Sequence, residues 1–471
     1  MYMLSRDENE PLLSRNGTHQ TPADTACEVT NNGRNHDSET ATSSHGLDRK
    51  ESSGPLPKDI SRIAGASYSF LVMGLINSSV GVMIPQLQRF YGLNDIQVSF
   101  LFLIMPLGYL LAAFANHNVH MRFGQRGIAI LAPFCQLTSV CLIYAHPPFI
   151  LVLISSAIGA VGTGLLDGSW CAWAAGMKNA NTISGVLHGS YSFGASLGPF
   201  LASTMLSKIH RPWYDWYFFL SIAVLLEIII LFSAFRSEDA AKYMAEKPEE
   251  GKTNISQLAV IVQQPSVWMC AAYFLADVGT ESTISGWIVT FVSRYHHGSV
   301  YNSGLCSSGF WIGMAAGRLV LGPVTDFVGI RSATATYLVL FIMSHALFTI
   351  STTPVLLIAT AALLGVFCGP LFPNGVVLLL SHLPSRLHVG AVSFVALIGQ
   401  VGSALLPFAL GALSQHLGMR VFPIVVFAEL VTILGLWVCF AKLPVRPPDL
   451  HVRRQTVNEQ QSGGHDNQND H

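Results

Sequence analysis

Two acidic residues lie four positions apart in a stretch that is otherwise apolar or small. The stretch is FLADVGTESTISGW, residues 274–287, and the acids are Asp277 and Glu281. In a soluble helix, residues at i and i+4 share one wet face, and such acids need no explanation. In a helix that crosses a bilayer, each charge is costly and typically binds a solute or carries a proton. The surrounding elements decide between these two cases.

A third carboxylate, Asp167, lies among glycines and tryptophans in GTGLLDGSWCAW, residues 162–173. At lipid depth such a group could take up a proton on one side and release it on the other, and we expect this role for Asp167. The alternative is a structural acid that is hydrogen-bonded across a helix bundle. His188, also in an apolar segment, could relay that proton or donate to a substrate hydroxyl, or it could only cap a neighbouring group.

Two tryptophans and two asparagines are candidates for binding a ring-shaped solute. Trp170 and Trp287 offer flat apolar surface, and Asn77 and Asn374 offer hydrogen bonds. Tryptophans in apolar helices more often pack against neighbours or anchor at a membrane interface, so each of the two has a structural alternative.

The composition is typical of a membrane protein. The 471 residues are 51% hydrophobic and only 11% charged. Residues 1–61 and 442–471 are polar tails that we expect to be disordered. Between them, apolar segments alternate with short polar breaks, and each segment is long enough to cross a hydrocarbon layer of about 30 Å.

Twelve such segments are predicted, and the fold class is therefore an all-α membrane protein. They cover, within a few residues, 62–84, 96–116, 127–145, 149–173, 183–207, 214–235, 266–292, 303–323, 333–351, 355–380, 389–413 and 419–441. With both tails in the cytoplasm, twenty of the 26 Lys and Arg residues lie on the cytoplasmic side, as the positive-inside rule requires. We expect a plasma-membrane protein with both termini inside, in which the glycosylation sequons at Asn16 and Asn254 are chance matches.

The polar segment 236–265 divides the spans six and six, and the two halves match at a nearly constant offset. The matched pairs are Gly81 with Gly286 and Arg89 with Arg294 at 205 residues, Asp167 with Asn374 at 207, and Gly194 with Gly402 and Pro199 with Pro407 at 208. We therefore predict two pseudo-symmetric six-helix bundles, 62–235 and 266–441, joined by a cytoplasmic linker. Such halves are expected to enclose a site near the bilayer midplane and to rock about it.

Other classes of function find little support in the sequence. There is no HExxH, no GxSxG and no metal-ligand spacing of Cys or His, so we expect no enzyme, no metal and no cofactor. The near-zero net charge without a basic patch argues against a nucleic-acid partner. The expected partners are the lipid bilayer, protons and a small-molecule substrate, and the expected state is a monomer. A nutrient sensor or receptor on a transporter scaffold remains an alternative.

The segment GRLVLGPVTDFVGIR, residues 317–331, resembles the signature of the major facilitator superfamily between spans 8 and 9. The resemblance implies the twelve-helix facilitator fold and a charged latch that holds the cytoplasmic side closed. In this chain the latch falls on Arg318, Gly322, Asp326, Gly329 and Arg331, and its first-half counterpart falls on Arg122, Gly124 and Arg126. Met121 stands where the first-half signature has an acid, so that half of the latch must be weaker or differently built. The alternative is positive-inside charge combined with turn glycines.

Within that superfamily the chain is similar to the fucose and hexose symporter branch, especially to its fungal members of the bypass-of-stop-codon type. The likeness covers nearly all twelve spans and rests on NSSVGVMIPQLQRFYGLNDIQ (77–97), GTGLLDG (162–168), HGSYSFGA (188–195) and VGTESTISGWIVTF (278–291). It implies that Asp167 is the protonatable carboxylate and that Glu281 faces the substrate. The chain departs from the branch at Gly81, where the fucose symporter has an acid.

Span 5 carries a pattern that bears on the direction of transport. Gly185, Gly194, Gly198 and Pro199 have the spacing of the antiporter motif of drug-exporting facilitators, although such small residues also serve tight helix packing. Together with the missing acid at Gly81, the motif favours proton-coupled export of a small organic molecule, such as a metabolite. The alternative is proton-coupled uptake of a sugar or a similar polar solute.

The two acids of the opening stretch are thus expected in span 7, with both carboxylates facing the bundle interior or a wet cavity. Unless a cation such as Arg318 lies near, one of the two should hold a proton at neutral pH. We predict that Glu281 lines the cavity and that Asp277 assists it. Arg318 is predicted to be a structural partner of a buried acid rather than a substrate ligand.

Overall fold

The computed structural model describes residues 57–177, 180–246, 255–384 and 387–444, and in these ranges the chain forms helices joined by short connections. Most of both predicted tails, part of the predicted linker, and the sequons at Asn16 and Asn254 lie outside the described residues. The first helix begins at Pro57, slightly before the predicted span, because a proline and the acidic Asp59 both suit the first turn of a helix.

Five helices make up the first half. They are α1 (Pro57–Tyr91), α2 (Asp95–Tyr144), α3 (Phe149–Ala175), α4 (Ala180–Ser207) and α5 (Asp215–Phe235). Helix α2 holds two predicted spans, and between them Gly124 has φ 68° and ψ −166°. Glycine adopts a positive φ at little steric cost, so the predicted loop between spans 2 and 3 is reduced to a hinge at this residue.

The second half has seven helices, and two short helices precede it. The short ones are α6 (Ala240–Glu246) and α7 (Ile255–Val262); the others are α8 (Pro265–Tyr295), α9 (Val300–Val328), α10 (Ile330–Ile350), α11 (Pro354–Cys368), α12 (Leu371–Leu380), α13 (His388–Leu417) and α14 (Val421–Ala441). Helices α11 and α12 together fill predicted span 10. The break between them falls at Gly369 and Pro370, because proline has no N–H with which to continue a helix.

Nine helices within the described ranges are long and apolar enough to cross a membrane. One of them is α2, whose 50 residues extend over about 75 Å of helix, enough for two crossings. Helices α4 and α8 are not among the nine. They carry serines, threonines, histidine or acids within their length, which lowers their mean hydropathy. The observed helices are thus consistent with the twelve predicted crossings.

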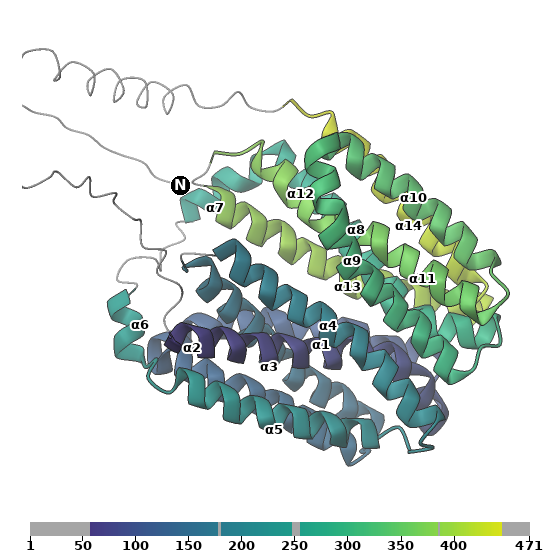
Figure 1. The fold of residues 1–471 in the computed structure, drawn as a ribbon, viewed down its shortest axis with the longest axis horizontal. Helices are drawn as coiled ribbons and strands as arrows, with labels where there is room; N and C mark the ends of the chain where they lie inside the picture. The colour runs from purple at the N-terminus through teal and green to yellow at the C-terminus, as the bar shows by residue number, and fades with distance from the viewer. Residues whose placement is uncertain (1–56, 178–179, 247–254, 385–386, 445–471) are drawn as a thin grey trace, which may run out of the picture. The chain divides into compact units, whose positions relative to one another are not determined.

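The two halves repeat the same packing, as the sequence repeat predicts. Helix α1 packs along α4, and its counterpart α8 packs along α13 (Figure 1). The contact is a close approach of backbones: a Cβ at Gly194 would overlap the carbonyl oxygen of Leu71, and a Cβ at Gly402 would overlap that of Leu275. Small residues at these positions permit the approach. Across the halves, α2 contacts α13, α4 contacts α9, and α1 contacts α8.

We name the two ends of the bundles by what lies there. The tail face is the end at which α1 begins and α14 ends, and it also carries the Gly124 hinge, α6 and α7. The opposite face carries the connections between α1 and α2, between α8 and α9, and between α13 and α14.

Candidate functional site: a cavity between the two halves

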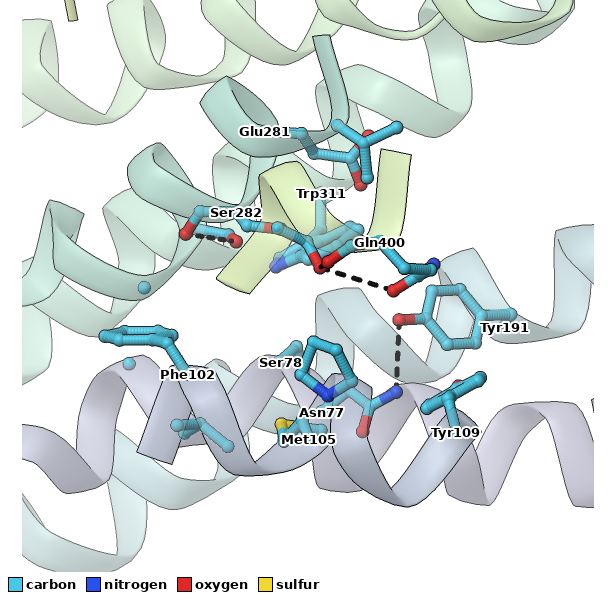
Figure 2. A pocket seen from close by; sticks show the side chains of 17 residues that line it. Asn77, Ser78, Phe102, Met105, Tyr109, Tyr191, Glu281, Ser282, Trp311 and Gln400 are labelled. Carbon is cyan, nitrogen blue, oxygen red and sulfur yellow. Dashed lines mark hydrogen bonds between the residues drawn. The ribbon is translucent and has the colours of Figure 1, made fainter. Parts of the chain in front are cut away.

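A cavity of about 190 Å³ lies between the two halves, lined by residues of α1, α2, α4, α8, α9 and α13 (Figure 2). Its lining includes Asn77, Tyr109, Tyr191, Glu281, Trp311 and Gln400. Hydroxyl, amide, carboxyl and aromatic groups thus converge on one small space, which is the usual composition of a site for a small polar molecule.

Asn77 is the centre of the first-half wall. Its Nδ2 donates to the hydroxyl of Tyr191 at 3.5 Å, and its side chain also contacts the hydroxyl of Tyr109 (Figure 2). Its Oδ1 is buried, and among the described residues nothing donates a hydrogen bond to it. Since buried acceptors are rarely left unpaired, this oxygen is suited to accept a hydrogen bond from a bound solute.

The acids of α8 differ in their access to the cavity. Glu281 lines it, as predicted, whereas Asp277, one turn earlier, is only 3% exposed and is not part of the lining. The positive charge of Arg318 acts on both carboxylates. Arg318 is therefore the nearby cation that the sequence analysis considered for this pair of acids. Arg318 itself donates from Nε to the carbonyl oxygen of Gly369 at 3.2 Å, at the break between α11 and α12.

Asp167 and His188 lie together on the first-half side. The thiol of Cys171 donates to Oδ1 of Asp167 at 3.6 Å, and its sulfur lies 4.0 Å from Nε2 of His188. Tyr191 interacts electrostatically with both Asp167 and Glu281. Tyr191, at the cavity wall, therefore lies within electrostatic range of a carboxylate from each half.

Three of the residues predicted to contact the substrate do not line this cavity: Trp170, Trp287 and Asn374. The ring of Trp170 is fully buried and stacks on Phe235 at 4.3 Å. Trp287 is fully buried and donates to the carbonyl oxygen of Pro407 at 2.9 Å. Asn374 donates to Thr334 at 2.8 Å. Trp170 and Asn374 are occupied within their own halves, and the ring of Trp287 also lies 5.9 Å from that of Phe102 of the first half.

The sequence reasoning missed several lining residues, among them Tyr109, Trp311 and Gln400. The sequence repeat could have predicted one further lining residue. Its offset of 205 places Ser282 at the position equivalent to Asn77, and both residues line the cavity. The same offset carries Pro106 onto Trp311, which also share the lining.

A second polar cluster, also missed, ties the halves together at the opposite face. Asp95, at the start of α2, is 6% exposed. Gln88 donates to its Oδ1 at 2.6 Å, Ser414 donates to its Oδ2 at 2.9 Å, and its N–H donates to Gln415 at 2.9 Å. Arg294 binds the same carboxylate, so α1, α2, α8 and α13 meet at one acid.

Comparison with known proteins agrees with this geometry. The family model described as Major Facilitator Superfamily matches residues 66–303 and 269–462. The chain belongs to the Major Facilitator Superfamily. It is 25% identical over 406 residues to bypass of stop codon protein 6 of Saccharomyces cerevisiae, covering 79% of this chain and 81% of that protein. It is 24% identical over 271 residues to the fosmidomycin resistance protein of Escherichia coli, covering 57% of this chain and 66% of that protein.

Solved structures support the facilitator fold. The nucleoside transporter NupG superposes with a TM-score of 0.64 at 11% sequence identity, covering 83% of this chain and 100% of that one. At this identity the likeness shows the fold alone. The all-α facilitator fold predicted from the sequence is therefore confirmed, as is the resemblance to the bypass-of-stop-codon type of facilitator, and the predicted count of twelve helices is consistent with it.

The predicted facilitator latch lies on the tail face. In the second half, Arg331 donates to the carbonyl oxygen of Leu443 at 3.4 Å, and within the described residues no ion pair joins it to Asp326. A Cβ at Gly322 or Gly329 would meet nothing within 4 Å. The guanidinium of Arg122 lies 5.3 Å from the ring centre of Phe123. Gly124 and Arg126 instead contact the segment after α5, through backbone atoms.

The glycines and the proline of the predicted antiporter motif lie in α4, which is predicted span 5, and their surroundings differ. Gly194 and Gly198 pack against the α1 backbone at Leu71 and Leu75, and Pro199 lies beside Gly304 of α9. A Cβ at Gly185 would meet nothing within 4 Å. Three of the four residues thus serve close packing, a role that suits importers and exporters alike.

Two further acids in apolar helices have structural partners. Glu227 of α5 is fully buried and accepts a hydrogen bond from Ser69 of α1 at 2.6 Å. Glu429 of α14 accepts one from Thr283 of α8 at 3.5 Å. Neither acid lines the central cavity, so both are suited to hold helices together.

Proposed function

We propose that this facilitator is a proton-coupled secondary transporter that moves a small polar organic molecule through the central cavity by alternating access, and that it works as an exporter. The observation that carries the proposal is the cavity itself. It lies between the repeated halves and presents a free amide oxygen of Asn77, the carboxylate of Glu281 and the indole of Trp311 to one space. A site shared by two halves can be exposed to either face when the halves rock.

Proton coupling is assigned to Asp167, with His188 and the pair Glu281 and Asp277 as further candidates. Asp167 is linked through Cys171 to His188 and electrostatically to Tyr191 of the cavity wall. A proton gained or lost at Asp167 therefore changes the field at the solute site. That coupling is what a proton-driven transporter requires.

Export is favoured over uptake by the surroundings of Gly81 and by one relative. At Gly81, where the resembling fucose symporter has an acid, a Cβ would lie 2.6 Å from the carbonyl oxygen of Ser285, so the approach of α1 and α8 leaves no room for a carboxylate. The resistance named for the Escherichia coli relative agrees with outward transport. The glycines of span 5 carry less weight, because their packing explains them.

The remaining features follow the expected topology. We place both tails in the cytoplasm, so the tail face is cytoplasmic, and we place the protein in the plasma membrane as a monomer. The halves are taken as the bundles 62–235 and 266–441, in agreement with their internal packing.

Everted vesicles test coupling and direction. With the interior acidified and followed by a pH-sensitive dye, an exported solute such as fosmidomycin should release protons when it is added outside. Asp167→Asn should abolish this release, whereas Glu227→Gln, a matched change of a buried acid outside the cavity, should retain it. Equal release by native chain and Asp167→Asn would refute the assignment of Asp167.

Uptake of a sugar is the second candidate, and the hydroxyl and amide lining of the cavity is the observation that favours it. Cells that express the chain should then accumulate labelled hexose in a manner that an uncoupler abolishes. An exporter instead lowers the retention of fosmidomycin and leaves hexose uptake unchanged.

A further inference from the structure

The segment that follows α5 folds back onto the tail face of the first half. Glu238 is 6% exposed. Its Oε1 is bound by the guanidinium of Arg62 at the start of α1 and by the ammonium of Lys242 at 2.6 Å. Its carbonyl oxygen accepts the N–H of Arg126 at 2.9 Å. One buried glutamate therefore joins α1, α2 and α6.

The hinge glycine shows how closely this segment approaches. A Cβ at Gly124 would overlap the backbone of Glu238 and Asp239. The equivalent glycine of the second half, Gly329, also has a positive φ, 93°, but a Cβ there would meet nothing within 4 Å. The segment after α5 thus covers the hinge of the first half, while the same surface of the second half is open among the described residues.

The two hinge loops also differ in charge. The repeat offset of 205 places Met121 opposite Asp326, so the first-half loop has no carboxylate at that position. Met121 is 42% exposed, and its thioether cannot replace an acid. Glu238 contacts the same loop through its carbonyl oxygen, which accepts the N–H of Arg126, while its carboxylate binds Arg62 and Lys242.

Helix α6 also forms a wall of a second cavity, of about 430 Å³, on the tail face. Its other walls come from α2 and α3 and include Asn116, Ser169 and Trp173. Tyr243 of α6 lines it, and the ring of Tyr243 lies 4.8 Å from that of His120 on α2. The second cavity shares no lining residue with the central one.

We propose that residues 237–246 are a gate over this second cavity. Glu238 anchors the gate to Arg62 and to the α2 hinge, and Tyr243 closes the cavity wall against His120. During the conformational cycle the gate moves away from His120 and opens the cavity at the tail face. The docked position is independent of the proposed function, whereas the movement rests on alternating access.

The anchor is tested by the reactivity of a thiol inside the cavity. Ser169 is 3% exposed and donates to Asn116 at 3.0 Å, so Ser169→Cys places a thiol in the wall with little change of size. We expect Glu238→Gln to raise its labelling by a water-soluble maleimide at least tenfold, as measured at that residue by mass spectrometry. Asp239→Asn should change the rate less than twofold, because among the described residues the side chain of Asp239 accepts the N–H of Lys242, within the gate itself.

Two further results test whether the ion pair of Glu238 and Arg62 holds the gate in place. Arg62→Gln should also accelerate labelling, and the double variant should be no faster than Glu238→Gln alone, since Glu238→Gln already removes the ion pair with Arg62. Equal labelling of Ser169→Cys with and without Glu238→Gln would overturn the proposal. So would additive effects of the two single changes.

The movement is tested by locking the gate. His120→Cys and Tyr243→Cys should form a disulfide on oxidation, and this lock should slow labelling of Ser285→Cys, in the central cavity, from the tail face at least fivefold. Reduction should restore the rate, and oxidation should not change the rate of either single-cysteine variant. If the locked protein is labelled as fast as the reduced one, the gate does not move in the cycle, and the proposed transport function is left intact. If the lock acts as expected but vesicles show no proton release, the transport proposal fails and the gate stands.

Discussion

Arg294 donates from Nη1 to both carboxylate oxygens of Asp95, at 2.8 and 3.0 Å, and so joins α8 of the second half to α2 of the first. Its Nη2 donates to Gln88 at 2.6 Å. A two-oxygen contact to a guanidinium is directional as well as charged, and the acid is nearly buried. The pair therefore links the two halves at the opposite face.

Breaking this pair should favour opening at the opposite face. Asp95→Asn keeps the size of the side chain but removes the charge-assisted bonds, and we expect a loss of about 1.5 kcal/mol, or roughly tenfold in the equilibrium between closed and open states. The measurement is the rate at which Ser285→Cys is labelled from that face. Arg211→Gln is the control, because its partner Asp215 lies in the same half and the pair does not join the two halves. A similar acceleration by both variants would contradict the latch.

Trp311 should contribute to solute binding, and Trp170 should not. The indole nitrogens of both residues have no acceptor among the described residues, but only Trp311 lines the cavity. Trp311→Phe keeps an aromatic ring and removes the N–H, so we expect KM to rise about fivefold, the worth of one hydrogen bond, with kcat nearly unchanged. Trp170→Phe should leave KM within twofold. The assay is solute transport in everted vesicles, and an unchanged KM for Trp311→Phe would remove it from the site.

The helices were predictable from the sequence because the bilayer leaves few alternatives. Each long apolar run must satisfy its own backbone hydrogen bonds, so it becomes a helix, and the repeat then pairs α1 with α4 and α8 with α13. The predicted spans agree with the helices within a few residues, apart from the hinge at Gly124 and the break at Gly369. Glu281 was found for the same reason, since a charge in such a helix cannot face lipid.

Which side of each helix faces the cavity was not predictable in the same way. A membrane helix is apolar toward lipid and often toward its neighbours too, so the sequence does not distinguish the buried Trp170 and Trp287 from the cavity-lining Trp311. Asp95 follows the helix-capping residue Asn94 and suits the first turn of any helix. Its ion pair with the distant Arg294 therefore could not be predicted from the local sequence.

Gly194 should be essential for the packing of α4 on α1, whereas Gly185 should not. Gly194→Ala puts a methyl group onto the carbonyl oxygen of Leu71, and overpacking of this kind costs about 1–3 kcal/mol. Gly185→Ala meets open space and should be neutral or slightly stabilising, since alanine is the better helix former. Thermal unfolding in detergent compares the two. Equal unfolding temperatures would show that the close approach of α1 and α4 yields easily to an added methyl group.

The two acids of α8 should have separable effects on binding but a joint effect on stability. Glu281→Gln changes a group in the cavity wall, so KM should rise, whereas Asp277→Asn changes a side chain outside the lining and should leave KM within twofold. For stability the partner is Arg318, whose charge acts on both acids. Each single change leaves Arg318 the opposite charge of one acid, but the double change removes both, and a part-buried cation without opposite charge is destabilising. Thermal unfolding should therefore show a double variant less stable than the sum of the single effects. Strictly additive losses would mean that Arg318 does not depend on these two acids, and that its hydrogen bond to Gly369 holds it without them.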